Sequence, residues 1–195
     1  MEPEAQSEPA RMTVDEWFAL PEDEPGELVD GALVEEEVPD PAHELIITWV
    51  TSLLRFWMRG RTGFVFGSGA KLKLGEHRGR MPDASAYLPG SAKPPARGPI
   101  AVPPDIAIEV VSTSPRDMRR DRIEKMNDYA AFKVRFYWLI DPVARLLEIY
   151  ELEEGGLYRR ALGASAGRVE TVPGCEGLTL DLDELWTELD ALEQS

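Results

Sequence analysis

Residues 105–112 read Asp-Ile-Ala-Ile-Glu-Val-Val-Ser, and this stretch decides the fold. The near-continuous apolar run from Ile106 to Val111 is typical of a strand buried on both faces of a sheet. Ser114 and Pro115 then supply a cap residue and a proline at the first helical position, so a helix is predicted from Pro115 to Phe132. A second apolar run, Arg135 to Ile140, predicts another buried strand. This succession indicates an α/β fold with a mixed sheet flanked by helices.

Further elements are expected on both sides of this unit. Asp30-Gly31 lies between two short apolar runs and predicts a β-hairpin, because both turn residues of such a hairpin adopt positive φ. Six prolines make 89–104 a loop. The other predicted elements are a short helix between Thr13 and Pro21, a helix from Pro41 to about Gly60, strands at 64–66, 70–74 and 83–88, a hairpin of 146–152 with 157–162, and a helix over 180–192.

Length and composition predict a single domain. The chain has 195 residues, of which 43% are hydrophobic, and this suffices for one core over residues 12–192 behind a disordered acidic tail, 1–11. No apolar run is long enough to span a membrane, and the first residues lack the features of a signal peptide. Cys175 is the only cysteine, which excludes an intramolecular disulfide and a four-thiolate zinc site. We expect a cytoplasmic protein.

The charge is unevenly distributed along the chain. The formal net charge is −15, yet residues 43–147 carry 17 basic and 10 acidic side chains, and the acidic excess lies in the two ends. A basic middle is suited to a phosphate backbone. The alternative is that acidic ends simply favour solubility.

Glu109 stands out because it interrupts an apolar strand. A buried carboxylate costs several kcal/mol unless it is paired or binds a metal, so Glu109 either forms an ion pair with a core-facing Arg or Lys or is a metal ligand. Asp105 lies on the same strand, about 13 Å away at 3.3 Å per residue, which is too far to share an ion. Asp83 is on a different strand, and paired strands bring opposite side chains to about 5 Å. Asp83 with Glu109 is therefore the candidate pair, and oxygen ligands suit Mg²⁺ or Mn²⁺.

The helix after Glu109 supplies a cation. Asp121, Lys125 and Tyr129 are spaced four apart and share one helix face, and we expect Ile123, Met126 and Ala130 to form the buried side. Lys125 is either a surface lysine paired with Asp121 or, beside two acidic ligands, a group that holds a phosphate oxygen or orients the attacking water.

The order of these motifs resembles a known family. The matching motifs are Glu27-Leu-Val-Asp-Gly-Ala-Leu-Val34, Pro41-x-His43, Pro82-Asp83, Glu109-Val-Val-Ser112, Asp121-x3-Lys125-x3-Tyr129 and Phe136-Tyr-Trp-Leu-Ile-Asp-Pro142. Over residues 12–186 the chain resembles the bacterial Uma-type family of restriction-endonuclease-like proteins, within the PD-(D/E)xK nuclease superfamily.

The resemblance implies a restriction-endonuclease-like fold that hydrolyses phosphodiester bonds of nucleic acid, with DNA as the expected substrate. It implies that Asp83 and Glu109 bind Mg²⁺ and that Lys125 assists. Two positions depart from the pattern, since Val111 stands where the superfamily has its lysine and Gly26 where the family has an aromatic residue. Glu27 is either a further acidic member of the site or only a hairpin residue. Small nucleases of this superfamily often cut as dimers, so the analogy adds a homodimer as an expectation, although the sequence itself does not indicate subunit number.

Other functions fit the sequence less well. Ser112 and Ser114 lack a nucleophile elbow, and no glycine-rich phosphate loop is present. The rival hypothesis is a catalytically inactive module that keeps the fold and binds nucleic acid or a protein. In either case the 89–104 loop joins the two ligand strands, so we expect one of its ends near the site, with Lys93 and Arg97 able to touch a nucleic-acid backbone.

Overall fold

The computed structural model describes residues 11–21, 24, 26–35, 38–112 and 114–194. The tail expected at 1–11 lies outside these residues, except for Arg11. The elements are α1 (Val14–Phe18), β1 (Glu27–Val29), β2 (Ala32–Val34), α2 (Pro41–Trp57), β3 (Phe64–Phe66), β4 (Leu72–Gly75), β5 (Arg78–Arg80), β6 (Ala84–Tyr87), β7 (Ile106–Val110), α3 (Pro115–Arg119), the π-helical segment η1 (Arg120–Lys125), α4 (Met126–Phe132), β8 (Phe136–Asp141), β9 (Leu146–Leu152), β10 (Tyr158–Ala164), β11 (Arg168–Val169), β12 (Leu180–Asp181) and α5 (Leu182–Glu193).

A six-stranded mixed sheet forms the centre, in the order β10-β9-β8-β7-β6-β3. β7 and β8 are parallel and the other neighbours are antiparallel. The parallel pair is the strand–helix–strand unit that the sequence predicts around residues 105–140, because a parallel neighbour requires a long crossover. The mixed α/β fold is thus confirmed.

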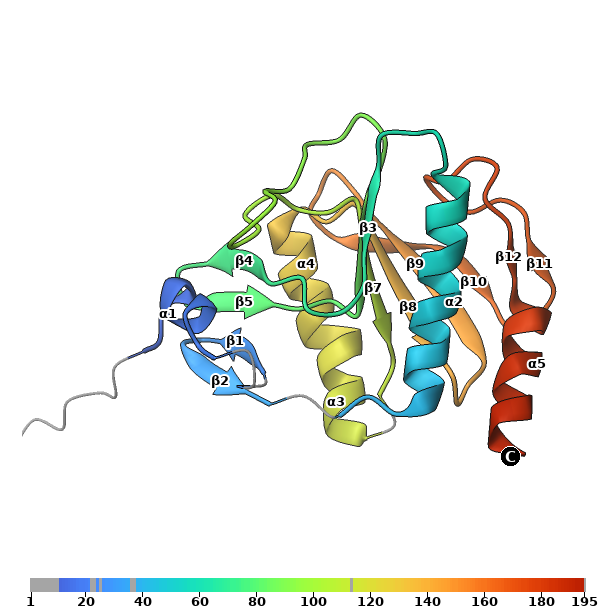
Figure 1. Cartoon of the computed structure of the whole chain (residues 1–195), viewed down its shortest axis with the longest axis horizontal. Coiled ribbons are helices and arrows are strands. Elements are labelled where there is room, and N and C mark those ends of the chain that lie inside the picture. Colours follow the sequence, from blue (N-terminus) through green and yellow to red (C-terminus); the bar gives the residue numbers. More distant parts are fainter. Residues whose placement is uncertain (1–10, 22–23, 25, 36–37, 113, 195) are drawn as a thin grey trace, which may run out of the picture.

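Each face of the central sheet has its own core. Alternate β7 residues point to opposite faces, so Ile108 packs in the cluster that contains α2 and α5, and Ala107 in the cluster that contains Tyr129 of α4. Figure 1 shows α2 and α5 on one side of the sheet and the α3–η1–α4 helix on the other. Glu109 shares the parity of Ala107 and therefore faces the α3–η1–α4 helix.

A second sheet of four strands, β2-β1-β5-β4, lies beside α3–η1–α4 (Figure 1). The predicted β1–β2 hairpin is confirmed, with positive φ at Asp30 (52°) and Gly31 (81°). The β4–β5 hairpin was not predicted, because Arg78-Gly-Arg80 has no apolar run. β5 pairs with β1 and places Arg80 among buried groups.

The helix predicted over 115–132 is present, and its predicted buried face is partly right. Ala130 is buried and Met126 packs against the core, but Ile123 is 53% exposed. The polar Asp121, Lys125 and Tyr129 are at most 3% exposed. These polar groups turn inward because the sheet face that they cover carries Glu109. Residues 120–125 adopt π-helical geometry, a local widening that occurs often at functional sites.

The expected position of the 89–104 loop was also wrong. Asp83 precedes β6 and Glu109 lies near the end of the antiparallel β7, so the loop joins the opposite ends of these strands. At that end the Asp105 carboxylate accepts a hydrogen bond from Leu88 N (2.6 Å). The loop then packs on β4, where Lys73 N donates to Ile100 O (2.9 Å). Among the described residues, no helix has both the length and the apolar character needed to cross a bilayer.

Candidate active site

Asp83 and Glu109 face each other from adjacent strands. β6 pairs with β7 so that Ala84 lies opposite Ile108, and the same register places Asp83 opposite Glu109 one position outward. Directly opposite residues have Cβ atoms about 5 Å apart. The expectation that the two strands lie side by side is confirmed, while metal binding by the two carboxylates stays a prediction.

Glu109 is 1% exposed, and both of its carboxylate oxygens have partners. Lys125 Nζ lies 2.8 Å from Oε2, and the Tyr129 hydroxyl donates to Oε1 at 2.6 Å. Burial raises the pKa of Glu109 well above its ordinary value, the charge of Lys125 opposes that rise, and nearby carboxylates add to it. The ion pair expected as one alternative for Glu109 therefore exists, and its cation is the same lysine that the metal hypothesis assigns to the site.

Lys125 is 2% exposed, so its alternative interpretation as a surface lysine was wrong. Besides Glu109, its Nζ lies 3.7 Å from Glu27 Oε1 and 3.8 Å from Asp121 Oδ1. Three carboxylates thus surround one ammonium group and fix its direction. Asp121 is itself 3% exposed and accepts from Ser112 N (3.3 Å); burial raises its pKa, although the charge of Lys125 opposes the shift.

Asp83 is held at the mouth of this cluster by two donors. Val110 N donates to its Oδ2 at 2.8 Å, and His43 Nε2 lies 3.1 Å from the same oxygen. Burial alone would raise the pKa of Asp83, but the His43 hydrogen bond and the charge of Lys125 hold it below its ordinary value. Burial opposes protonation of His43, yet its bond to Asp83 raises the pKa of the imidazole.

Glu27 is the third carboxylate beside Lys125, with its Oε1 3.7 Å from Nζ. It is 1% exposed, accepts from Met81 N through Oε1 (2.7 Å) and pairs with Arg80 through Oε2 (2.6 Å). Arg80 is fully buried and also donates to Asp128 Oδ2 (2.7 Å). Burial alone would lower the pKa of Arg80, but the two carboxylates raise it. Glu27 is thus more than a hairpin residue, since it connects the N-terminal hairpin to the lysine.

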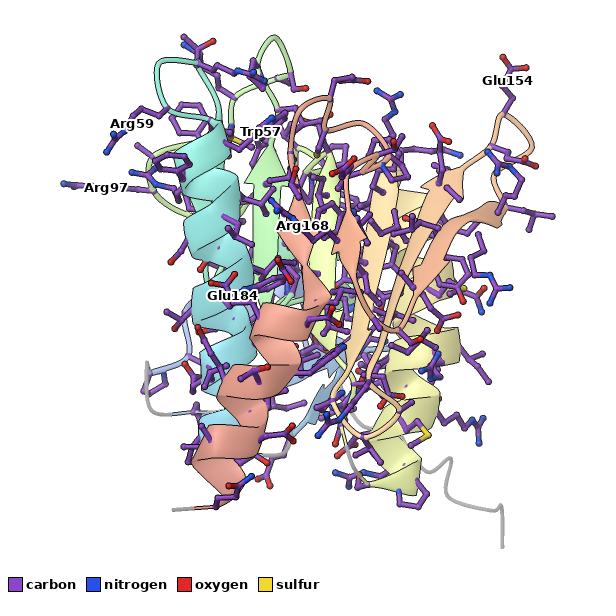
Figure 2. The ribbon with its side chains drawn as sticks, turned by 90° about the vertical axis from the view of Figure 1, so that its right-hand side faces the viewer. Trp57, Arg59, Arg97, Glu154, Arg168 and Glu184 are labelled. Atoms are coloured by element: carbon purple, nitrogen blue, oxygen red, sulfur yellow. The ribbon has the colours of Figure 1, made fainter. Side chains whose placement is uncertain are left out.

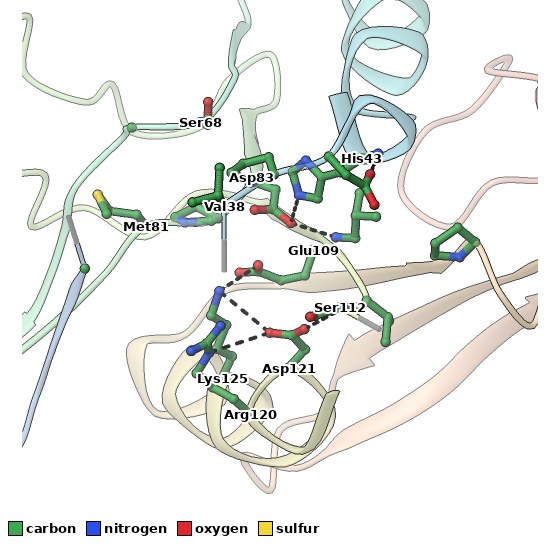
Figure 3. A pocket seen from close by; sticks show the side chains of 18 residues that line it. Val38, His43, Ser68, Met81, Asp83, Glu109, Ser112, Arg120, Asp121 and Lys125 are labelled. Atoms are coloured by element: carbon green, nitrogen blue, oxygen red, sulfur yellow. Dashed lines mark hydrogen bonds and ion pairs between the residues drawn. The ribbon is translucent and has the colours of Figure 1, made fainter. Parts of the chain in front are cut away.

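A pocket of about 340 Å³ opens onto the cluster, as Figure 3 shows. Asp83, Glu109 and Lys125 line it, with His43 on its α2 wall and Arg120 on its η1 wall. Apolar side chains, among them Val38, Met81, Pro82 and Pro142, complete the walls. Glu27 is not a lining residue and touches the site only through Lys125. The structure therefore brings all four predicted residues together and exposes three of them to the pocket.

The donor set of this pocket fits a cation that keeps much of its water. Among the described residues, no group of three His, Cys, Asp or Glu side chains is close enough to hold a metal ion. Mg²⁺ is commonly held by only one or two carboxylates, with water and substrate phosphate completing its octahedron. Asp83 and Glu109 offer such a pair, and Lys125 and Arg120 place positive charge where a phosphate would lie.

The sequence analysis missed three contributors to the pocket, His43, Arg120 and Asp121. Asp121 had a signal, its four-residue spacing from Lys125, but it was assigned to a surface pair. His43 follows Asp40-Pro41, where the helix start was recognised, and a lone histidine at a helix start carries no evidence of its partner. Arg120 follows another arginine in a basic run, so only its burial distinguishes it.

Three comparisons with known proteins bear on this site. Residues 14–183 match the model of the Uma2 family, described as "Putative restriction endonuclease". A search among curated protein sequences finds no match. A solved structure described as a putative nuclease belonging to DUF820 from Anabaena variabilis ATCC 29413 is 22% identical, with a TM-score of 0.71. The match covers 91% of this chain and 99% of that one, and at this identity it shows a shared fold.

Proposed function

The chain belongs to the Uma2 family of restriction-endonuclease-like proteins, and on this basis we propose that it is a metal-dependent endonuclease that hydrolyses phosphodiester bonds of DNA. One observation carries the proposal. Asp83 and Glu109 project from opposite positions of adjacent strands into one pocket, where Lys125 lies 2.8 Å from Glu109. Two carboxylates and a buried lysine are the groups that metal-assisted attack on a phosphodiester requires.

In the proposed mechanism Asp83 and Glu109 hold Mg²⁺ or Mn²⁺. When bound, the ion supplies Lewis-acid charge on the phosphate and lowers the pKa of an attacking water. Lys125 donates to a phosphate oxygen as negative charge develops there, and its low exposure strengthens that interaction. Asp121 and Glu27 keep the ammonium charged and directed, and His43 orients the Asp83 carboxylate.

A second candidate is a module that binds nucleic acid or protein without cleavage. It is favoured by the contacts of the Glu109 carboxylate. Both of its carboxylate oxygens already have partners in the protein, Lys125 Nζ at 2.8 Å and the Tyr129 hydroxyl at 2.6 Å. Under this hypothesis the Lys125 network stabilises the fold and the pocket has no hydrolytic role.

A nuclease assay with a parallel metal titration separates the two. Wild-type protein, Asp83→Ala and the control Asp15→Ala are incubated with supercoiled, linear and single-stranded DNA and with RNA, in Mg²⁺ or Mn²⁺. Asp15 is a suitable control because its side chain is 73% exposed on α1, outside the pocket. We expect cleavage of DNA, and a sub-millimolar Mn²⁺ site, in wild type and Asp15→Ala but not in Asp83→Ala. Absence of both from wild type would favour the binding module.

Dimer formation belongs to the same proposal, since two copies would cut the two strands of a duplex. Light scattering across a range of protein concentrations, with and without DNA, measures it directly. A species that stays monomeric under both conditions would remove the homodimer from the proposal and leave single-strand nicking.

A further inference from the structure

Arginine and aromatic side chains gather where α2 ends. We call this the arginine–aromatic surface; its members are Arg55, Phe56, Trp57, Arg59 and Arg61. It lies far from the pocket, because His43 is near the start of α2 and Phe56 is 13 residues later, about 20 Å at 1.5 Å per residue. Figure 2 shows Trp57 and Arg59 at this end of α2.

The surface is continuous with the start of the 89–104 loop. Gly63 packs so closely against Tyr87 O and Pro89 that a Cβ there would lie 2.9 Å and 3.5 Å from them. The same loop carries Lys93 and Arg97, both exposed. The basic loop that was expected near the catalytic cluster therefore begins beside the arginine–aromatic surface, at the opposite end of the sheet.

Charge at this end opposes that of the whole chain. The net charge is −15, yet residues 45–70 and 84–104 contain five basic residues and no acidic one. The C-terminal dipole of α2 accounts for a preference for Arg55 and Arg59 near the helix end. It does not account for Arg61 beyond the helix or for the two basic residues of the loop. Glu176 borders the surface, since its carbonyl accepts a hydrogen bond from Trp57 Nε1 (3.1 Å).

Phe56 is exposed to a degree that a folding role does not explain, since 71% of it is open to solvent. The Arg59 guanidinium lies 5.4 Å from the centre of the Phe56 ring, and that of Arg61 lies 4.7 Å from the Trp57 ring. Flat cationic and aromatic groups set side by side form a surface on which bases stack while the guanidiniums meet phosphates.

We propose that the arginine–aromatic surface binds single-stranded nucleic acid and acts as an anchor for the strand outside the pocket. This inference rests on the proposed function for its biological purpose, since a nuclease must hold the strand that it cuts. Unpaired bases are required because the bases of a duplex are stacked on each other and cannot lie on Phe56. About 20 Å corresponds to about six stacked nucleotides at 3.4 Å each, so only longer strands could occupy both sites.

Fluorescence anisotropy tests the proposal with the full chain in EDTA, so that no cleavage occurs. The probes are a labelled 20-nucleotide oligothymidylate and a 20-base-pair duplex. The variants are Phe56→Ala and the double change Arg59→Ala with Arg61→Ala. Matched controls are Leu157→Ala, whose side chain is equally exposed (74%), and Arg159→Ala with Arg168→Ala, exposed arginines of β10 and β11.

We expect Phe56→Ala to weaken oligothymidylate binding by about five-fold or more, within the range for a lost base–aromatic stack. The arginine double variant should weaken it by about ten-fold and reduce the slope of log affinity against log salt by about 1.4, since each phosphate contact on a single strand contributes about 0.7. The two controls should bind as wild type does. Duplex affinity should be unchanged in Phe56→Ala.

Two results would overturn the proposal. The first is unchanged oligothymidylate binding in both test variants, and the second is an equal loss for duplex and single strand in Phe56→Ala, which would indicate charge attraction without stacking. The Asp83→Ala variant separates this inference from the proposed function. Suppose that Asp83→Ala binds oligothymidylate normally while the wild type cuts no nucleic acid. The proposed binding surface is then supported, and the nuclease proposal is rejected. If Asp83→Ala abolishes binding, the strand is held in the pocket and the anchor is rejected.

Discussion

Lys125 Nζ lies 2.8 Å from Glu109 Oε2, and both residues are at most 2% exposed. A lysine and a glutamate that the chain separates by 16 positions thus form a buried ion pair in the wall of the pocket. Removing one member of such a pair leaves an uncompensated buried charge, so changes at these positions should lower stability and, under the proposed mechanism, turnover.

Lys125→Met should lower the free energy of unfolding by about 3 kcal/mol, because Glu109 then stays buried without its cation. Under the proposed mechanism the same change should lower turnover by about 100-fold. Urea denaturation and a single-turnover cleavage assay measure the two effects. The double variant Glu109→Gln with Lys125→Met should be more stable than Lys125→Met alone, since no unpaired charge remains. A double variant less stable than the single one would contradict the buried-pair argument.

Tyr129→Phe should weaken Mn²⁺ binding by about 10-fold, because its hydroxyl orients the Glu109 carboxylate from 2.6 Å. Tyr87→Phe is the matched control, as it removes a buried hydroxyl that donates to Val102 O at 2.8 Å, away from the pocket. Both variants should lose about 1–2 kcal/mol of stability. Isothermal titration calorimetry with Mn²⁺ should distinguish them, and equal affinities would show that the hydroxyl has no role in orienting the ligand.

Arg80→Met should cost about 3 kcal/mol or more of stability, because it leaves the buried carboxylates of Glu27 and Asp128 without their cationic partner. Arg159→Met removes an arginine whose side chain is 56% exposed and pairs with two surface glutamates, and should cost at most about 1 kcal/mol. Chemical denaturation of both variants provides the comparison. A cost below 1 kcal/mol for Arg80→Met would mean that the network contributes little to stability.

Glu148→Gln should reveal a pH-dependent contribution to stability. Burial alone would raise the pKa of Glu148, but hydrogen bonds from Arg122 and Tyr150 hold it below its ordinary value. A carboxyl with a lowered folded-state pKa stabilises the protein above its unfolded pKa of about 4.5 and loses that contribution as the pH falls through the folded value. The stability gap between wild type and Glu148→Gln should therefore be largest near pH 7 and shrink below about pH 4.5.

Unfolding curves collected between about pH 3 and pH 8 measure that gap. Glu170→Gln is a suitable control, because Glu170 is exposed and should show no such dependence. A gap of constant size across this range would mean that ionisation of Glu148 is not what stabilises its surroundings.

Local patterns in the sequence were enough for most of the elements, though not for the β4–β5 hairpin, and for placing the two carboxylates on neighbouring strands. The Asp30-Gly31 turn, the apolar strand around Glu109 and the Ser114-Pro115 helix start are each encoded within a few residues, and all are present. Asp83 and Glu109 could be paired because opposite positions of neighbouring strands lie close, whereas Asp105 and Glu109 on one strand cannot. The position of the 89–104 loop also followed from the sequence, since Asp83 opens one strand and Glu109 nears the end of the next, but that consequence was not recognised.

Only the tertiary structure decided which face of the 115–132 helix is buried. Its apolar residues favoured a face with Ile123, whereas Asp121, Lys125 and Tyr129 turn inward because the covering sheet carries a carboxylate. The spacing of residues along a helix shows which of them share a face, but it does not show which part of the protein packs against that face.

The same holds for Glu27 with Arg80 and for Asp83 with His43, which join segments separated by 53 and 40 positions. Burial of a charge is favourable only when its partner is in place, and that partner is brought there by the packing of the whole chain. The sequence therefore determined the elements and the two facing carboxylates, and the tertiary structure determined the charge network that surrounds them.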